Sequence, residues 1–135
     1  MKSLITISIV IGAMTLNAKN KFIVVVNNMT CSQCVFEVTK YLKHKNQKVA
    51  IGYTDSGNTL QNLKLRSHIE NQYSEVLNVK IIELENYYYR AYNDSLHPIV
   101  LKINNHQDTS AFFYHQIFSY GSFLNFSSFD KLLRE

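Results

Sequence analysis

The segment Phe22–Leu42, FIVVVNNMTCSQCVFEVTKYL, decides the fold of this chain. It opens with five apolar, mostly β-branched residues and continues into Asn27 and Asn28, which is the pattern of a short buried strand followed by a turn. The only two cysteines, Cys31 and Cys34, come next. After them, apolar residues recur at the spacing of one helical face: Val35, Val38, Tyr41 and Leu42. The segment therefore predicts a strand, a turn and a Cys-X-X-Cys pair in the first turn of a helix.

The first turn of a helix is a favourable place for a reactive thiol. Unpaired backbone N–H groups and the positive end of the helix dipole stabilise an anion there. They lower the pKa of a cysteine, so that thiolate is available at neutral pH. We predict that Cys31, the more exposed sulfur, attacks a disulfide and that Cys34, one turn later, resolves the mixed disulfide.

Size and composition indicate one globular domain. The chain has 135 residues, of which 46% are hydrophobic, with a single proline and four glycines. This composition argues against a disordered or linker-rich chain. The formal net charge is +4, and the basic residues are scattered rather than gathered into a patch. The sequence therefore argues against nucleic-acid binding.

The first eighteen residues resemble a secretory signal peptide. Lys2 gives a short positive region, and Leu4–Leu16 forms an apolar stretch of thirteen residues. Leu16-Asn17-Ala18 ends in a small residue, as a signal-peptide cleavage site does. Thirteen residues are too few to span a bilayer comfortably. We expect residues 1–18 to be removed and residues 19–135 to form the mature domain. The protein would then be exported, either periplasmic or secreted, and would contact a membrane only if this segment stays uncleaved.

Export would place the two cysteines in a compartment where disulfides persist. A dithiol there serves as a structural staple, a redox couple or a metal clip. A four-residue loop closes little chain entropy and therefore stabilises a fold weakly, which argues against the staple. We therefore favour a functional dithiol.

The rest of the chain alternates helices and strands. Two helical crossovers would make the first strands parallel, and the Asn-rich turn after the fourth strand predicts an antiparallel return. The only proline, Pro98, stands where a strand opens, a position that needs no donor. The expected elements are strand 48–53, helix 59–76 capped by Thr59, strand 79–84, a helical turn over 86–93, strand 99–103, turn 104–108, strand 111–118 and a closing helix 127–134 capped by Ser127 or Ser128.

This order resembles the thioredoxin fold, and most closely the exported thiol-disulfide oxidoreductases related to membrane-anchored cytochrome-maturation thioredoxins. The resemblance implies an α/β domain with a central mixed sheet of about four strands flanked by helices. It also implies a cis proline beside the dithiol, matched here by Pro98 after His97, and a proton acceptor matched by Glu37. Protein dithiols and disulfides would be the partners, with no cofactor beyond Cys31 and Cys34. A protonated His97 beside the dithiol would raise the thiolate content.

A second resemblance uses the same cysteines. Met29-Thr30-Cys31-Ser32-Gln33-Cys34 looks like the loop of the heavy-metal-associated domain, which holds Cu(I) or a similar soft ion through two thiolates. That domain has a strand hairpin soon after its first helix, whereas residues 59–76 read as helical here. Dithiol redox chemistry is therefore the first hypothesis, with soft-metal carriage as the alternative.

Overall fold

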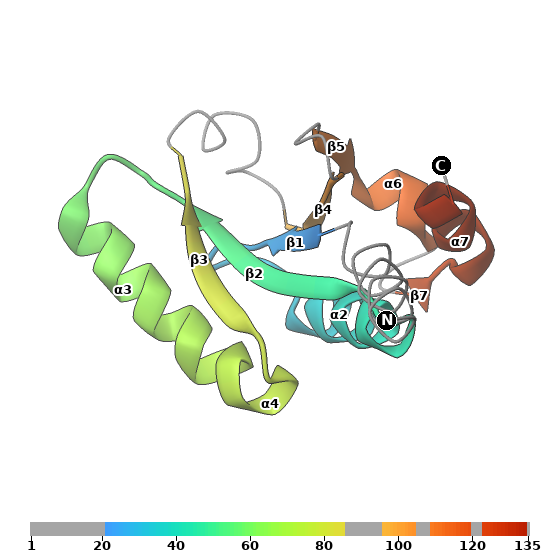
Figure 1. Ribbon diagram of the computed structural model, residues 1–135. Helices are drawn as coiled ribbons and strands as arrows, with labels where there is room; N and C mark the ends of the chain where they lie inside the picture. Colours follow the sequence, from blue (N-terminus) through green and yellow to red (C-terminus); the bar gives the residue numbers. More distant parts are fainter. Residues whose placement is uncertain (1–20, 86–95, 105–108, 120–122, 135) are drawn as a thin grey trace, which may run out of the picture.

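The computed structural model describes residues 21–85, 96–104, 109–119 and 123–134 (Figure 1). The expected signal segment 1–18, the helical turn 86–93 and most of the turn 104–108 lie outside these residues. The described elements are β1 (Lys21–Val25), α2 (Ser32–His44), β2 (Lys48–Thr54), α3 (Thr59–Ile69), η1 (Glu70–Ser74), α4 (Glu75–Leu77), β3 (Lys80–Leu84), β4 (Ile99–Ile103), β5 (Thr109–Phe112), α6 (Tyr114–Ile117), β6 (Phe118–Ser119), β7 (Phe123–Leu124) and α7 (Phe126–Arg134).

A five-stranded mixed sheet forms the centre, in the order β3-β2-β1-β4-β5. The crossovers through α2 and α3 make β1, β2 and β3 parallel, as predicted. The hairpin β4-β5 runs antiparallel, with β4 paired to β1. In this register Val24 lies opposite Ile51 on one side and Val100 on the other. β1 is therefore the central strand, and the cysteine loop leaves from its carboxyl end.

The main core lies between one face of this sheet and the helices. Alternation along β1 directs Phe22 and Val24 to that face, where they belong to one buried cluster with α2, the α3–α4 stretch and α7. Val38 of α2 and Phe129 of α7 are fully buried in it. The opposite face of the sheet carries a second, smaller buried cluster: Ile23, Val25, Ile99 and Leu101.

The helix expected over 59–76 is present, but it contains a π-helical turn, η1. Ile69, Tyr73 and Leu77 are all buried, and they are spaced four residues apart. This spacing places them on one face of the helical stretch, and the π turn, which takes up one extra residue, lies between Ile69 and α4. The N-cap of α3 is Asn58 rather than Thr59, because Asn58 Oδ1 accepts from the Gln61 N–H at 2.9 Å.

The return strand expected over 111–118 is shorter than predicted. β5 ends at Phe112, and the chain then turns through α6, because Gln116 Oε1 accepts from the Phe113 N–H at 2.8 Å. This turn lets both Phe112 and Ile117 reach the core, where they are 6% and 0% exposed. The closing helix is also present, as α7, but its first turn is capped by Asn125, whose Oδ1 accepts from the Ser128 N–H at 3.1 Å.

Candidate active site

A hydrogen-bonded turn carries the chain from β1 to the cysteines. The Asn27 N–H donates to Thr30 Oγ1 at 2.8 Å, and the Thr30 hydroxyl donates to Asn27 Oδ1 at 3.1 Å. The same Oδ1 accepts from the Met29 N–H at 2.7 Å. Asn27 and Thr30 therefore close the turn from both ends, and they fix the direction in which the next residue, Cys31, enters the helix.

Cys31 and Cys34 form a disulfide at the start of α2, with their Cα atoms 5.4 Å apart. Cys31 is the N-cap of the helix, and its Sγ accepts from the Cys34 N–H at 3.2 Å. Cys34 is 0% exposed, whereas Cys31 is only partly buried against the same core. The pair thus has one accessible sulfur, at the positive end of a helix, and one sulfur inside the protein.

The segment before β4 reaches the dithiol through its backbone. The Cys31 N–H donates to the Leu96 carbonyl oxygen at 2.9 Å. β4 lies beside β1, with Ile99 opposite Val25, so Pro98 opens its strand next to the loop that carries the cysteines. The prediction that Pro98 stands where a strand opens is therefore confirmed.

The cis bond expected at Pro98 is wrong. Every peptide bond among the described residues is trans, including the bond between His97 and Pro98. The trans form is the lower in energy for an X-Pro bond by about 0.5 to 1 kcal/mol. The Leu96 carbonyl already links this segment to Cys31, so the approach of the two segments needs no cis bond. Pro98 is buried and His97 is half-buried.

Glu37 lies one helical turn after Cys34 on α2. It is half-buried, and its Oε2 is inaccessible and has no hydrogen-bond partner among the described residues. Glu37 also lines a groove of about 420 Å³ beside the dithiol helix, together with Ser32 and Gln33 from between the two cysteines. An unpaired carboxylate oxygen in this place is available to a proton, which suits the role that the resemblance implies.

Two exposed apolar side chains flank the dithiol. Met29 is 66% exposed, two residues before Cys31, and Leu96, whose carbonyl binds the Cys31 amide, is 57% exposed. Sequence reasoning did not single out Leu96. The only signal was its place just before His97 and Pro98, because nothing local shows that this carbonyl meets the cysteine loop.

The arrangement differs from that of the heavy-metal-associated domain. After α2 and β2 the chain enters α3 and returns in a parallel strand, where that domain has a strand hairpin. Within the described ranges, no three His, Cys, Asp or Glu side chains are grouped so that they could hold a metal ion. The similarity to that domain is therefore confined to the Met29–Cys34 loop. No helix in the same ranges is long and apolar enough to cross a membrane.

No family model matches the chain, and no curated protein matches it. Among solved structures it is similar to the solution structure of the reduced form of the N-terminal domain of PilB from N. meningitidis. The TM-score is 0.53 at 12% sequence identity, over 90% of this chain and 85% of that chain. The chain has a thioredoxin-like α/β fold, and it carries a Cys-X-X-Cys pair at the start of α2.

Proposed function

We propose that this protein is an exported thiol-disulfide oxidoreductase that works through Cys31 and Cys34. One observation carries the proposal: the two cysteines form a disulfide in which a partly exposed Cys31 caps α2 while Cys34 is buried. Helix N-termini lower the pKa of a thiol, and only a thiolate attacks a disulfide at a useful rate. The accessible sulfur is thus also the one that the helix activates.

In the reduced protein, the Cys31 thiolate attacks one sulfur of a partner disulfide. A bond forms between the Cys31 Sγ and that sulfur, and the second partner sulfur leaves as a thiolate. The Cys34 thiol then loses its proton and attacks the Cys31 Sγ. This step forms the Cys31–Cys34 disulfide and releases the first partner sulfur as a thiolate. Two electrons pass from the protein to its partner, and the reverse sequence oxidises a partner dithiol.

Three residues would support these steps. Glu37, with its unpaired Oε2 one turn from Cys34, would accept the proton of the buried thiol before resolution. His97, in the segment linked to Cys31 through Leu96, would favour the thiolate when protonated. Pro98 would hold this segment at the start of β4, so that the partner chain meets a fixed edge beside Cys31. Met29 and Leu96 would give that partner an apolar rim.

Export rests on the first eighteen residues, and a chain working outside the cytosol would keep a disulfide of this kind. Cell fractionation with N-terminal sequencing tests this part of the proposal separately. We expect the mature protein in the periplasm or medium to begin at Lys19. A chain that remains in the cytosol with Met1 at its terminus would contradict export without touching the redox proposal.

The redox proposal is tested by insulin reduction with a supplied thiol reductant. We expect turnover by the mature protein and none by Cys31→Ala. Cys34→Ala should instead accumulate a mixed disulfide with insulin, visible by non-reducing electrophoresis, because attack proceeds and resolution does not. Glu37→Gln should slow resolution, because the amide cannot accept the proton of the Cys34 thiol. A mature protein that binds one Cu(I) tightly and turns over no disulfide would make the metal alternative correct.

A further inference from the structure

A groove of about 420 Å³ runs along α2 and starts at the dithiol. Most of its lining residues share one face of α2, at helical spacing, and Val76 joins them from α4. The α2 residues are Ser32, Gln33, Phe36, Glu37 and Lys40. Ser32 and Gln33 stand between the two cysteines, so the groove is continuous with the reactive pair. The redox proposal uses only Glu37 from this lining and assigns the rest no role.

Two large apolar side chains determine what the groove can bind. Val76 is 68% exposed, and Phe36 is half-buried. The Phe36 ring packs edge-on against Tyr73 of η1, with 5.4 Å between the ring centroids, and the Lys40 Nζ lies 5.7 Å from the Phe36 centroid. The ring is thus held in place from two sides. A fixed aromatic ring beside an exposed aliphatic side chain is a surface that takes up an apolar anchor of a binding partner.

Contacts between α2 and the helical stretch that carries Val76 fix the two sides of the groove relative to each other. Lys43 Nζ donates from α2 to the Leu77 carbonyl at 2.6 Å and to the Asn78 carbonyl at 3.0 Å, directly after Val76. The contact between Phe36 and Tyr73 joins the same two elements nearer the dithiol. The groove therefore exists before a partner arrives, and a preformed site binds with a smaller loss of conformational freedom.

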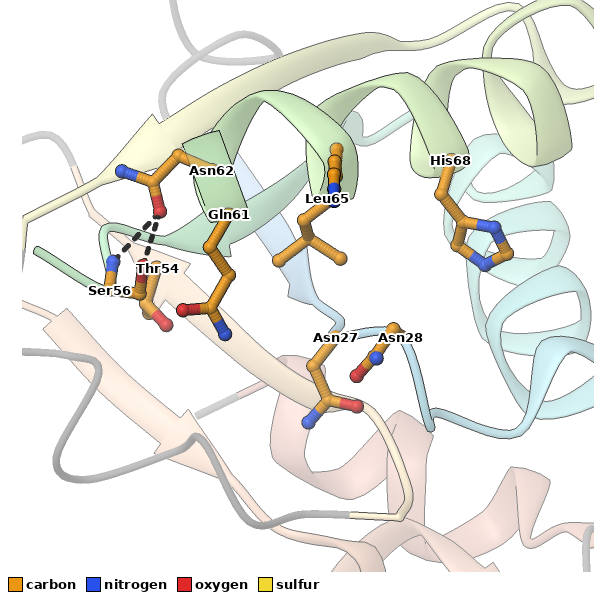
Figure 2. A pocket seen from close by; sticks show the side chains of 9 residues that line it. Asn27, Asn28, Thr54, Ser56, Gln61, Asn62, Leu65 and His68 are labelled. Atoms are coloured by element: carbon orange, nitrogen blue, oxygen red, sulfur yellow. Dashed lines mark hydrogen bonds between the residues drawn. The ribbon is translucent and has the colours of Figure 1, made fainter. Parts of the chain in front are cut away.

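A second depression lies near the cysteine loop. Figure 2 shows this cavity of about 340 Å³, with Asn27 and Asn28 on one side and Gln61, Leu65 and His68 of α3 on the other. Its described lining residues include neither a cysteine nor a residue between the cysteines. The groove on α2 includes both residues between them. We therefore place a partner that is joined to Cys31 in the groove.

The length of the groove sets which residues of a partner can reach it. Phe36 and Lys40 follow Cys31 by five and nine residues, which is about 7.5 and 13.5 Å along the helix axis. An extended polypeptide advances about 3.3 Å per residue, so the second to fourth residues from its cysteine cover this distance. Its side chains alternate between two faces. When the partner cysteine faces Cys31, the second and fourth side chains from it therefore face the groove.

We infer that this groove binds an extended segment of a protein substrate, and that it selects cysteines with large apolar side chains two and four residues away. The inference rests on the proposed redox function and names a substrate class for it. The anchors would cover Phe36 and Val76, the two apolar side chains of the lining. The bound segment would then hold its cysteine against Cys31 while the sulfurs exchange.

Three peptides of equal length and charge test the inference, each with one cysteine joined to nitrothiobenzoate through a disulfide. One carries leucine at the second and fourth positions on both sides of the cysteine, one carries leucine at the first and third positions, and one carries serine at all of them. The Cys31 thiolate of the reduced protein attacks the peptide sulfur, and nitrothiobenzoate leaves as a coloured thiolate. Cys34 loses its proton and attacks the Cys31 Sγ, which releases the peptide thiolate as the Cys31–Cys34 disulfide forms. The dithiol supplies both electrons. We expect the first peptide to react roughly tenfold faster than the other two, through partial burial of its leucines.

The ratio of the rates for the first and the serine peptide is compared among variants, because a general loss of reactivity leaves this ratio unchanged. Val76→Asp should lower the ratio to about one, since a carboxylate repels an apolar anchor, whereas Val76→Leu should keep it. Leu60→Asp is the matched control: Leu60 is 62% exposed on α3 and lies outside the lining, so this variant should keep the wild-type ratio. Equal rates for all three peptides, or the same loss of the ratio in Val76→Asp and Leu60→Asp, would overturn this inference and leave the redox function standing. Release of nitrothiobenzoate from none of the peptides would overturn the redox function itself.

Discussion

The backbone N–H of Cys31 donates to the carbonyl oxygen of Leu96 at 2.9 Å. This bond joins Cys31, the N-cap of α2, to the segment that precedes β4, although the two are far apart in the chain. It satisfies a donor at the helix start that no intrahelical carbonyl can reach. The bond thus fixes the Cys31 backbone against the segment that precedes β4.

The turn that carries Cys31 gives the first prediction. Thr30→Ala removes the hydroxyl that bonds twice to Asn27, and each such bond contributes about 1 kcal/mol. We expect the free energy of unfolding to fall by roughly 1 to 2 kcal/mol in urea titrations. The reduced variant should also react more slowly with an aromatic disulfide reagent. Thr30→Ser keeps the hydroxyl and should behave like the wild type; a loss as large in Thr30→Ser would show that the methyl group, and not the hydrogen bonds, matters.

The unequal exposure of the two sulfurs gives the second prediction. After mild reduction, iodoacetamide should alkylate Cys31 well before Cys34, because Cys34 is 0% exposed. Peptide mass spectrometry at successive times measures the order. The rate for Cys31 should reach its half-maximum below pH 8.5, the usual pKa of a free thiol. Equal labelling of both residues in the folded protein would contradict this assignment of roles.

Gly52 on β2 gives a prediction about packing. A Cβ at this position would lie 2.8 Å from Ile23 Cγ2 and 3.2 Å from Leu84 Cδ1, closer than side chains tolerate. Gly52→Ala should therefore lower the free energy of unfolding by roughly 1 to 3 kcal/mol, the usual cost of overpacking. Urea titration checks this. Ser67→Ala on the exposed part of α3 is the control, and an unchanged midpoint in both variants would show that β1 and β3 move apart readily.

Lys43 ties α2 to the end of α4. Its Nζ donates to the Leu77 carbonyl at 2.6 Å and to the Asn78 carbonyl at 3.0 Å, where Asn78 takes the left-handed conformation with φ 53°. Lys43→Ala should cost roughly 1 kcal/mol of unfolding free energy, because these terminal carbonyls lose a charged donor. Lys43→Arg should recover part of this. Thermal unfolding followed by circular dichroism distinguishes the two, and no difference from the wild type would mean that water replaces Nζ without loss.

Tyr73, in the π turn, gives a prediction about pH. Burial raises the pKa of Tyr73 to about 12, while its ring packs edge-on against Phe36. The unfolded chain ionises this phenol near pH 10, so the folded state binds the proton more tightly. The stability due to neutral Tyr73 is complete below pH 10 and is lost as the pH rises through 12. Tyr73→Phe should flatten this part of the stability curve, and two parallel curves would contradict the assignment.

Local hydrophobic periodicity was sufficient to predict the helices and strands around the dithiol. The apolar runs of β1 and β2 and the helical spacing after Cys34 predicted their order, their parallel pairing and the N-terminal place of Cys31. Each of these features depends on neighbours within a few residues. The same patterns predicted that Pro98 opens a strand.

The features that were missed depend on contacts across the fold. The π turn η1 lies within a segment whose apolar spacing predicted one continuous helix, and that spacing carries no signal for it. The apolar residues 111–118 were compatible with a strand, and only the place of Ile117 against the core required α6. Likewise, no local sequence pattern predicted the hydrogen bond from the Cys31 N–H to the Leu96 carbonyl. The cis bond at Pro98 came from family resemblance alone and was wrong.

The two borders of the central sheet bear on how this protein behaves at high concentration. β3 forms one border and shows Lys80 and Glu83 to solvent, while β5 forms the other with only four residues, of which Thr109 and Ser110 are exposed. Charged or very short outer strands are poor templates for adding a strand from another molecule. A sheet with such outer strands is thereby protected from aggregating with other chains along its backbone.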